Sequence, residues 1–369
     1  MSWIWIINIL SVFFLCVFFA GIVIPQILLI AFRKNLFDVP NERKIHKCVV
    51  PRLGGIAFKP VMFLSFVLLL AINLTTGHDE MFKEMGAEAL PLAYAFCAII
   101  MLYLVGIADD LIGIRYRAKF FVQIICGLML AMGGVVLSDL HGIFFLHSLP
   151  LWAGILLTIF VTVFIINAIN LIDGLDGLAS GLSSIALLSY GDTFIIFGQY
   201  IYAMISFATL GVLVPFYYYN VFGNAEKQRK IFMGDTGSLT IGIMLCFLSI
   251  KISGVPCEAG ALHVNPFVLA FAPMLVPCLD VVRVYLHRVR NRKSPFVADK
   301  NHIHHKLLAI GMEQRKAMIT IVLVSLSMTV INIVLSGFLD ITLLFVIDVT
   351  FWTLSNMLLT KKIINKPSK

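Results

Sequence analysis

The sequence predicts an all-α polytopic integral membrane protein with about eleven transmembrane helices, an N-terminus outside the cell and a C-terminus in the cytoplasm. Hydrophobic residues make up 60% of the 369 positions and charged residues only 13%, against about 45–50% and about 25% in soluble domains. The apolar residues form long blocks of the length that a bilayer requires of a helix. Lysine and arginine gather in alternate loops, as expected of a chain that crosses a membrane repeatedly.

The helices follow from these blocks. The first block lacks a basic n-region and is too long for a signal-peptide core, so it is predicted to remain as a membrane span. Later blocks end at polar clusters, including Asp109-Asp110 after the third and the Asn167–Gly177 stretch at the end of the fifth, where two glycines break the helix. The predicted helices cover 3–32, 61–74, 90–108, 118–137, 149–170, 178–197, 200–220, 237–253, 266–286, 317–337 and 341–359.

The basic residues set the predicted orientation. Of the 28 lysines and arginines, only Lys83 and Lys251 fall outside one set of alternate segments, which the positive-inside rule assigns to the cytoplasm. The net charge of +8 therefore reflects topology, and no nucleic-acid partner is indicated. We expect one transmembrane domain spanning 1–369. The inner segments are 33–60, 109–119, 171–177, 221–236, 283–316 and the tail 360–369.

Five aspartates gather at the predicted cytoplasmic helix ends: Asp109, Asp110, Asp173, Asp176 and Asp235. A carboxylate at a helix C-terminus is disfavoured by the macrodipole, by about 0.3–1 kcal/mol. Adjacent carboxylates also repel each other unless a cation lies between them, and a hard ion such as Mg²⁺ meets that need. The alternative is a solvated helix end whose acids pair with Arg115 or Arg117.

Two further polar stretches leave alternatives open. Asn167, Asn170, Asp173 and Asp176 recur every three residues, which predicts either a ligand-binding face or, for the asparagines alone, hydrogen bonds between helices. Asp235 lies in a Gly-Asp-Thr-Gly-Ser run just before a helix. It is either an N-cap or part of an anion site at the positive helix end.

Histidines mark the longest inner loop. His302, His304 and His305 lack the spacing of a zinc motif, so phosphate binding or a solvated loop remain the alternatives. Asp280 and Arg283 are predicted to form an ion pair within one helix. Asp348 is an acid deep inside a span, and the sequence assigns it no role.

These motifs together resemble one family along almost the whole chain. The motifs are Asp109-Asp110, the Asn167–Gly177 stretch, Phe232-Met233-Gly234-Asp235, and Pro295-Phe296 followed by His302-Ile303-His304-His305. They are similar to those of the polyprenyl-phosphate N-acetylhexosamine-1-phosphate transferases, a group within glycosyltransferase family 4. The resemblance implies an enzyme that transfers a sugar-1-phosphate from a UDP-sugar to undecaprenyl phosphate and releases UMP, with Mg²⁺, or alternatively Mn²⁺, as cofactor.

The resemblance also implies roles for individual residues. Asp235 is the first expected metal ligand, Asp110 the second, and Asp173 either binds the metal or holds a metal-bound water. Asp109 is the implied base or orienting group for the lipid phosphate, so that Asp109, Asp110 and Asp173 form the expected catalytic set. The residues expected to bind substrate are Lys47, Lys119, Asn170, Asp176, Phe232, His302, His304 and His305.

The branch of the family is indicated by two further segments. Pro40–His46 and Pro51-Arg52-Leu53-Gly54-Gly55 resemble the bacterial N-acetylglucosamine-1-phosphate transferases, which start O-antigen, common antigen or teichoic acid linkage units. The histidine motif, interrupted by Ile303, departs from the phospho-N-acetylmuramoyl-pentapeptide branch, which is kept as an alternative. An ion-coupled transporter and a lipid-binding scaffold are the other classes considered. Membrane lipids are expected partners, and a homodimer is one alternative for the assembly.

Overall fold

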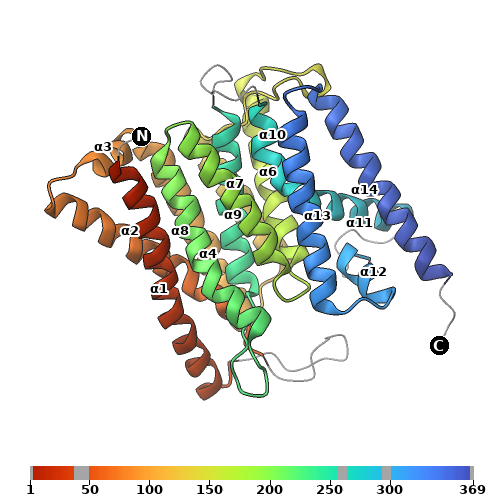
Figure 1. Cartoon of the computed structure of the whole chain (residues 1–369), viewed down its shortest axis with the longest axis horizontal. Helices are drawn as coiled ribbons and strands as arrows, with labels where there is room; N and C mark the ends of the chain where they lie inside the picture. Colours follow the sequence, from red (N-terminus) through yellow and green to blue (C-terminus); the bar gives the residue numbers. More distant parts are fainter. Residues whose placement is uncertain (1–2, 37–49, 256–263, 293–300, 366–369) are drawn as a thin grey trace.

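The structure, a computed structural model, describes residues 3–36, 50–255, 264–292 and 301–365. It is a bundle of helices that run side by side (Figure 1), and no β-strand forms within these ranges. Its long helices are α1 (Trp3–Arg33), α2 (Phe58–Thr75), α4 (Ala89–Ile112), α5 (Tyr116–Met132), α6 (Leu151–Ile172), α7 (Leu178–Ile196), α8 (Tyr200–Tyr217), α9 (Gly234–Ser253), α11 (Leu275–Arg290), α13 (Gln314–Leu335) and α14 (Ile341–Ile364). Shorter helical segments are η1 (Gly54–Ala57), α3 (Glu80–Ala87), η2 (Ile143–Phe145), η3 (Tyr218–Phe222), α10 (Pro266–Phe271), η5 (Ala272–Met274) and α12 (Ile303–Ala309).

Ten helical segments in the described ranges are long and apolar enough to cross a membrane, against about eleven predicted. The difference is α5, which was expected over 118–137 but has only 17 residues because the chain turns at Gly133-Gly134, where Gly134 has a φ of +79°. At 1.5 Å per residue a helix of this length rises about 25 Å, close to the thickness of the hydrocarbon core. Helix α1 begins and helix α14 ends at opposite ends of the bundle (Figure 1), which is the arrangement expected if α5 is counted as an eleventh crossing.

Helix α9 lies at the centre of the bundle and is buried along nearly its whole length. Its neighbours approach so closely because they meet it with glycines. A Cβ added to Gly106 of α4 would lie 2.4 Å from the Cα of Thr236, and one added to Gly55 would lie 2.0 Å from the backbone nitrogen of Gly237. Small residues at contact points are the usual device for helix packing in membranes, where no hydrophobic effect drives helices together.

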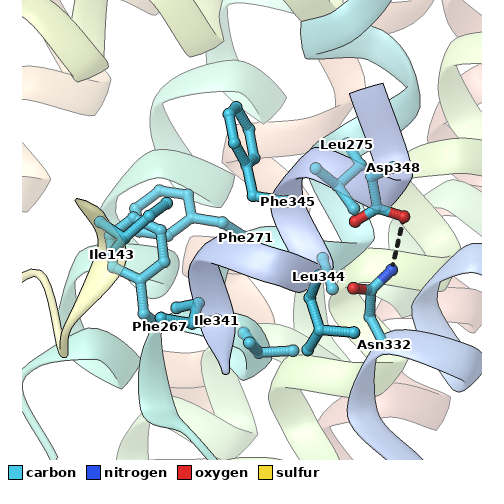
Figure 2. Close-up of a pocket in the computed structure, with 11 residues that line it drawn as sticks. Ile143, Phe267, Phe271, Leu275, Asn332, Ile341, Leu344, Phe345 and Asp348 are labelled. Atoms are coloured by element: carbon cyan, nitrogen blue, oxygen red, sulfur yellow. Dashed lines mark hydrogen bonds between the residues drawn. The ribbon is translucent and has the colours of Figure 1, made fainter. Parts of the chain in front are cut away.

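Polar pairs join other helices. Asn8 and Asn73 exchange hydrogen bonds of 3.2 and 2.9 Å between α1 and α2. Asp348, for which the sequence suggested no role, accepts a 3.0 Å hydrogen bond from the Nδ2 of Asn332 and so links α14 to α13 beside a small apolar pocket (Figure 2). Lys251, one of the two lysines that depart from the positive-inside pattern, pairs with Glu88 at 3.1 Å.

The predicted helix 266–286 is divided in the structure. It consists of α10, the short η5 turn and α11, and Pro273 lies in the η5 turn, where its missing N–H interrupts the helical hydrogen-bond ladder. Helix α11 then crosses the bundle at a steep angle to α13 (Figure 1). Helix α12, which begins with the histidine motif, follows at the end of the bundle where α4 and α6 also end.

Candidate active site

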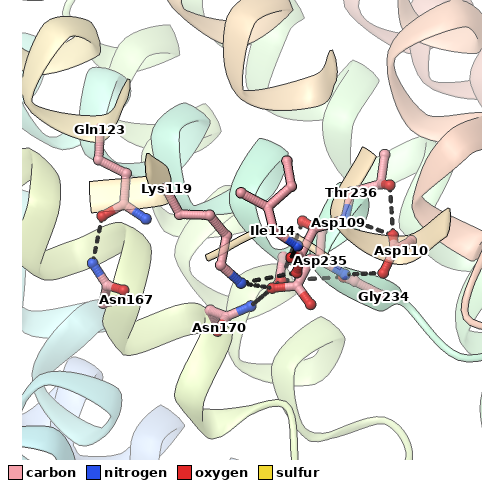
Figure 3. Close-up of polar contacts among 11 residues, drawn as sticks. Asp109, Asp110, Ile114, Lys119, Gln123, Asn167, Asn170, Gly234, Asp235 and Thr236 are labelled. Carbon is pink, nitrogen blue, oxygen red and sulfur yellow. Dashed lines mark hydrogen bonds and ion pairs between the residues drawn. The ribbon is translucent and has the colours of Figure 1, made fainter. Parts of the chain in front are cut away.

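Four helix ends meet at one end of the bundle (Figure 3). They are the C-terminal ends of α4 and α6 and the N-terminal ends of α5 and α9. The close contact between Gly106 and Thr236 brings the end of α4 against the start of α9. Gly113, with a φ of +71°, then ends α4 and turns the chain into α5. The predicted convergence of Asp109, Asp110 and Asp235 is therefore present in the structure.

Lys119 lies between two of these carboxylates. Its Nζ is 2.8 Å from the Oδ2 of Asp109 and 3.2 Å from the Oδ1 of Asp235 (Figure 3). The Nδ2 of Asn170 donates to the same Asp235 oxygen at 2.7 Å and to the Oγ of Ser238 at 2.8 Å. Asp109 therefore pairs with Lys119, and no contact with Arg115 or Arg117 was found for it in the described part of the chain. We call Asp109, Lys119, Asn170 and Asp235 the acidic cluster.

Asp110 has a different task from its neighbour Asp109. Its Oδ1 accepts a hydrogen bond from the backbone N–H of Asp235 at 2.8 Å, and its Oδ2 accepts from the N–H and the hydroxyl of Thr236 at 2.9 and 2.6 Å. These bonds satisfy free N–H groups at the start of α9, as a capping residue does. The capping alternative considered for Asp235 is thus wrong, because Asp110 caps the helix and leaves the Asp235 side chain facing Lys119 and Asn170.

The Phe232-Met233-Gly234-Asp235 motif is held by the segment Pro51–Gly55. The carbonyl of Pro51 accepts from the N–H of Phe232 at 2.8 Å. The N–H of Gly54 donates to the carbonyl of Phe232 and the N–H of Gly55 to the carbonyl of Met233, both at 2.9 Å. Gly234 has a φ of +72°, and a Cβ there would meet the carbonyl of Arg52 at 2.0 Å. Two motifs that are distant in the sequence therefore form one unit around the start of α9.

Asp176 belongs to a second polar group, in which sequence reasoning missed two members. Asp176 pairs with Lys230 at 2.5 Å, and the Nζ of Lys230 lies 6.0 Å from the ring centre of Phe232. The Asn220 side chain accepts from the N–H of Gly177 at 2.6 Å and donates to the carbonyl of Ile231 at 2.8 Å. Asn220 had a usable signal, since it is a lone amide in an apolar stretch. Lys230 had none, because the positive-inside rule already accounts for it.

The polar residues spaced three apart between Asn167 and Asp176 do not share one role. Asn167 donates to the side chain of Gln123 at 2.6 Å, so it links α6 to α5 through an interhelical hydrogen bond. Asn170 enters the acidic cluster. The helix ends at Ile172, and Asp173 is its C-cap residue, as the glycines predicted.

Asp173 is reachable by water but crowded by protein. This crowding, together with the negative charges of Asp235 and Asp176, raises the pKa of the Asp173 carboxyl to about 7. Desolvation and like charges both disfavour the ionised carboxylate. Both effects oppose ionisation of the Asp173 carboxyl, and a cation bound beside it would favour the ionised form.

Asp280 holds the histidine motif. Its carboxylate accepts from the N–H of Ile303 at 3.0 Å, contacts the Nδ1 of His302 at 2.8 Å and retains the predicted ion pair with Arg283 at 2.8 Å. His302 is buried and bonded to Asp280, so it positions the start of α12.

His304 is packed against the Asp173 turn. A Cβ added to Gly174 would lie 2.3 Å from the Nε2 of His304, and the ring centre of His305 lies 4.2 Å from that of His304. Burial and the neighbouring histidines lower the pKa of His304 to about 3. His304 is therefore a neutral imidazole, able to hydrogen-bond but carrying no charge for an ion pair.

The described residues contain no group of three or more histidine, cysteine or acidic side chains arranged to hold a metal. Mg²⁺, however, often binds through only one or two carboxylates, with water and substrate phosphates completing its shell. Asp109 and Asp235 converge on one cation, the ammonium of Lys119, so the donor set suits a hard ion. Lys47 lies outside the described residues, as do the Pro40–His46 and Pro295-Phe296 segments.

The fold and the site define a multi-pass membrane protein with an acidic, lysine-bridged centre at one end of its helices. The sequence pattern described as glycosyl transferase family 4 matches residues 92–253, which contain the whole acidic cluster. A relative from Bacillus subtilis (strain 168), named a probable undecaprenyl-phosphate N-acetylglucosaminyl 1-phosphate transferase, is 30% identical over 86% of this chain and 82% of its own. The chain therefore belongs to glycosyl transferase family 4.

Other relatives carry similar names. The decaprenyl-phosphate N-acetylglucosaminephosphotransferase of Mycobacterium tuberculosis (strain ATCC 25618 / H37Rv) is 35% identical over 80% of this chain and 74% of its own length. The undecaprenyl-phosphate alpha-N-acetylglucosaminyl 1-phosphate transferase of Yersinia pestis is 29% identical over 83% of this chain and 78% of its own length. The family expected from the motifs is thus confirmed.

Proposed function

We propose that this chain is an enzyme that transfers N-acetylglucosamine-1-phosphate to a polyprenyl phosphate. One observation carries the proposal. The acidic cluster lies inside the region that matches the family, in a chain that aligns with named transferases over about four fifths of its length. Neither a transporter nor a scaffold accounts for that likeness.

The finer form of the proposal names both substrates. A UDP-N-acetylhexosamine, preferably UDP-N-acetylglucosamine, is the donor and undecaprenyl phosphate the acceptor. A lipid phosphate oxygen attacks the sugar-bearing phosphorus, the bond to UMP breaks, and undecaprenyl diphosphate-sugar and UMP are formed. The pentapeptide donor of the sister branch is the competing alternative, and the isolated Ile303 within the histidine motif is the observation against it.

A divalent cation, Mg²⁺ or alternatively Mn²⁺, is part of this proposal. Asp235 is the first proposed ligand, because its carboxylate already faces a cation, the ammonium of Lys119. Asp173 is the second, because it is exposed at the end of α6. Asp110 remains a proposed ligand, although three hydrogen bonds already engage its oxygens. Such a cation would neutralise the charge that develops when a diphosphate and a phosphate meet.

The protein groups then have distinct tasks. Lys119 binds a phosphate when it exchanges its carboxylate partners for substrate. Asp109 orients Lys119 and the acceptor, since a phosphomonoester with a second pKa of about 6 is already mostly dianionic at neutral pH and needs no base. Phe232 offers a ring to the uracil beside Asp176, and His304 and His305 hydrogen-bond to the diphosphate or the sugar.

The side of the membrane is proposed from the basic residues. Inner segments rich in lysine and arginine lie at the cytoplasmic face of a bacterial inner membrane, and the acidic cluster lies at the same helix ends. Nucleotide sugars would therefore be used in the cytoplasm.

The direct test uses purified enzyme, undecaprenyl phosphate, Mg²⁺ and a panel of UDP-sugars, with UMP release as the readout. We expect turnover with UDP-N-acetylglucosamine or a C4 or C6 variant. Efficient turnover of the muramoyl-pentapeptide donor would contradict the sugar assignment, and no UMP from any donor would contradict the activity itself.

A further inference from the structure

A second cavity lies apart from the acidic cluster. It measures about 350 Å³ and is enclosed by α2, α3, α4, α8 and α9. Its walls are almost wholly apolar and include Phe63, Val67, Phe96 and Met244. The side chains of Phe63, Val67 and Phe96 are also exposed on the surface of the bundle, so the cavity has a rim that faces the lipid.

The cavity has one charged side chain, at the end nearest the acidic cluster. Lys59 lies in the first turn of α2, and its Nζ is 5.0 Å from the ring centre of Phe96 and 5.5 Å from that of Tyr103. Within the part of the chain that the structure describes, no carboxylate pairs with Lys59. A lysine ammonium near a helix end in a membrane is usually directed to the head-group level, where anionic lipids attract it.

The cavity is closed towards the acidic cluster. Gly106 and Thr236 touch through their backbones between the two sites, as do Gly55 and Gly237, and neither contact leaves room for even a methyl group. A phosphate paired with Lys59 is therefore separated by packed backbone from Asp109 and Asp235. A lipid bound in this way is not placed for the transfer reaction.

We propose that this cavity binds an anionic glycerophospholipid of the surrounding membrane, with its phosphate on Lys59 and one acyl chain between α2, α4 and α9. The charge of Lys59 and the apolar walls match the two parts of such a lipid. Because the lipid touches α4 and α9, which also carry Asp109 and Asp235, it holds together the helices that support the site.

The test compares retained lipids by native mass spectrometry of the purified full chain, equilibrated in detergent with equal amounts of phosphatidylglycerol and phosphatidylcholine. We expect the wild type to retain phosphatidylglycerol about fivefold better, the contribution of one basic residue at a membrane surface. Lys59→Gln should abolish this preference, while Lys59→Arg should keep it. Lys83→Gln is the matched control, because Lys83 is exposed and pairs with Asp79 outside the cavity.

A second variant tests the acyl-chain part. Val67→Trp places a bulky ring at the exposed rim, where it is not expected to disturb the core, and should reduce retention of both lipids. The proposal is overturned if Lys59→Gln keeps the wild-type preference or if Val67→Trp retains both lipids unchanged. It is also overturned if added undecaprenyl phosphate displaces phosphatidylglycerol one for one, which would assign the cavity to the acceptor. None of these readouts requires catalytic activity.

Discussion

Asp109 and Asp110 are adjacent in the sequence but occupy different surroundings. Asp109 faces Lys119, and Asp110 accepts three hydrogen bonds from the first turn of α9. The first arrangement leaves a charged pair available to a substrate. The second fixes the backbone on which Asp235 is carried.

Amide substitutions should therefore separate the two residues. Asp110→Asn is expected to lower stability by about 1–3 kcal/mol, since an amide provides only one acceptor oxygen where two are used. Asp109→Asn should reduce turnover at a smaller cost in stability, because the amide oxygen can still accept from the N–H of Ile114 and only the pair with Lys119 is lost. The thermal unfolding midpoints of both variants in detergent would check this, and equal midpoints would contradict the assignment of Asp110 as a helix cap.

The pH dependence of Asp109→Asn tests whether Asp109 is a base. Because the lipid phosphate loses its second proton at a pKa of about 6, a base would matter less as pH rises above that value, and the loss of activity would shrink. We expect a constant loss between about pH 6 and about pH 8, as a positioning role requires. Ratios of variant to wild-type kcat over that interval are the measurement.

Removal of the metal should abolish turnover. Asp235→Asn keeps the shape of the side chain but removes the charge that would offset a cation, so activity should fall by about two orders of magnitude. Excess EDTA should abolish the activity of the wild type, and added Mg²⁺ should restore that activity. Full turnover in excess EDTA would contradict the proposed metal requirement.

At the scale of elements, the site depends on how closely helices approach α9. Gly106 lets α4 touch Thr236, and a shift of α4 would move Asp109 and Asp110 together. The positions of the carboxylates are thus set by a residue with no side chain.

Gly106→Ala should consequently lower stability by about 1–3 kcal/mol, the usual cost of overpacking, and reduce activity as well. Gly86→Ala in α3 is the matched control, because a Cβ there meets nothing within 4 Å and the exchange should be neutral or slightly stabilising. Unfolding midpoints and UMP release of both variants decide the comparison. A harmless Gly106→Ala would mean that the helices can move apart without cost.

For the whole molecule, helix α1 begins and helix α14 ends at opposite ends of the bundle (Figure 1), and the acidic cluster lies at one end only. Catalysis is therefore expected at one membrane face. The distribution of lysines and arginines among the loops favours the cytoplasmic face.

Sealed vesicles test this sidedness. Inside-out vesicles should consume added UDP-N-acetylglucosamine, and right-side-out vesicles should stay silent until they are permeabilised. Activity in intact right-side-out vesicles would reverse the proposed orientation.

Periodicity and composition suffice to predict most of the helices, because a bilayer demands long apolar segments whatever their neighbours are. The motif resemblance likewise predicts the family. Chain order does not reveal that Asp110 caps α9, that Lys119 joins Asp109 to Asp235, or that Asp280 holds His302. Each of these contacts joins residues from different elements. The partners of a carboxylate depend on the three-dimensional packing of helices, which glycines such as Gly55 and Gly106 permit and which only the tertiary structure decided.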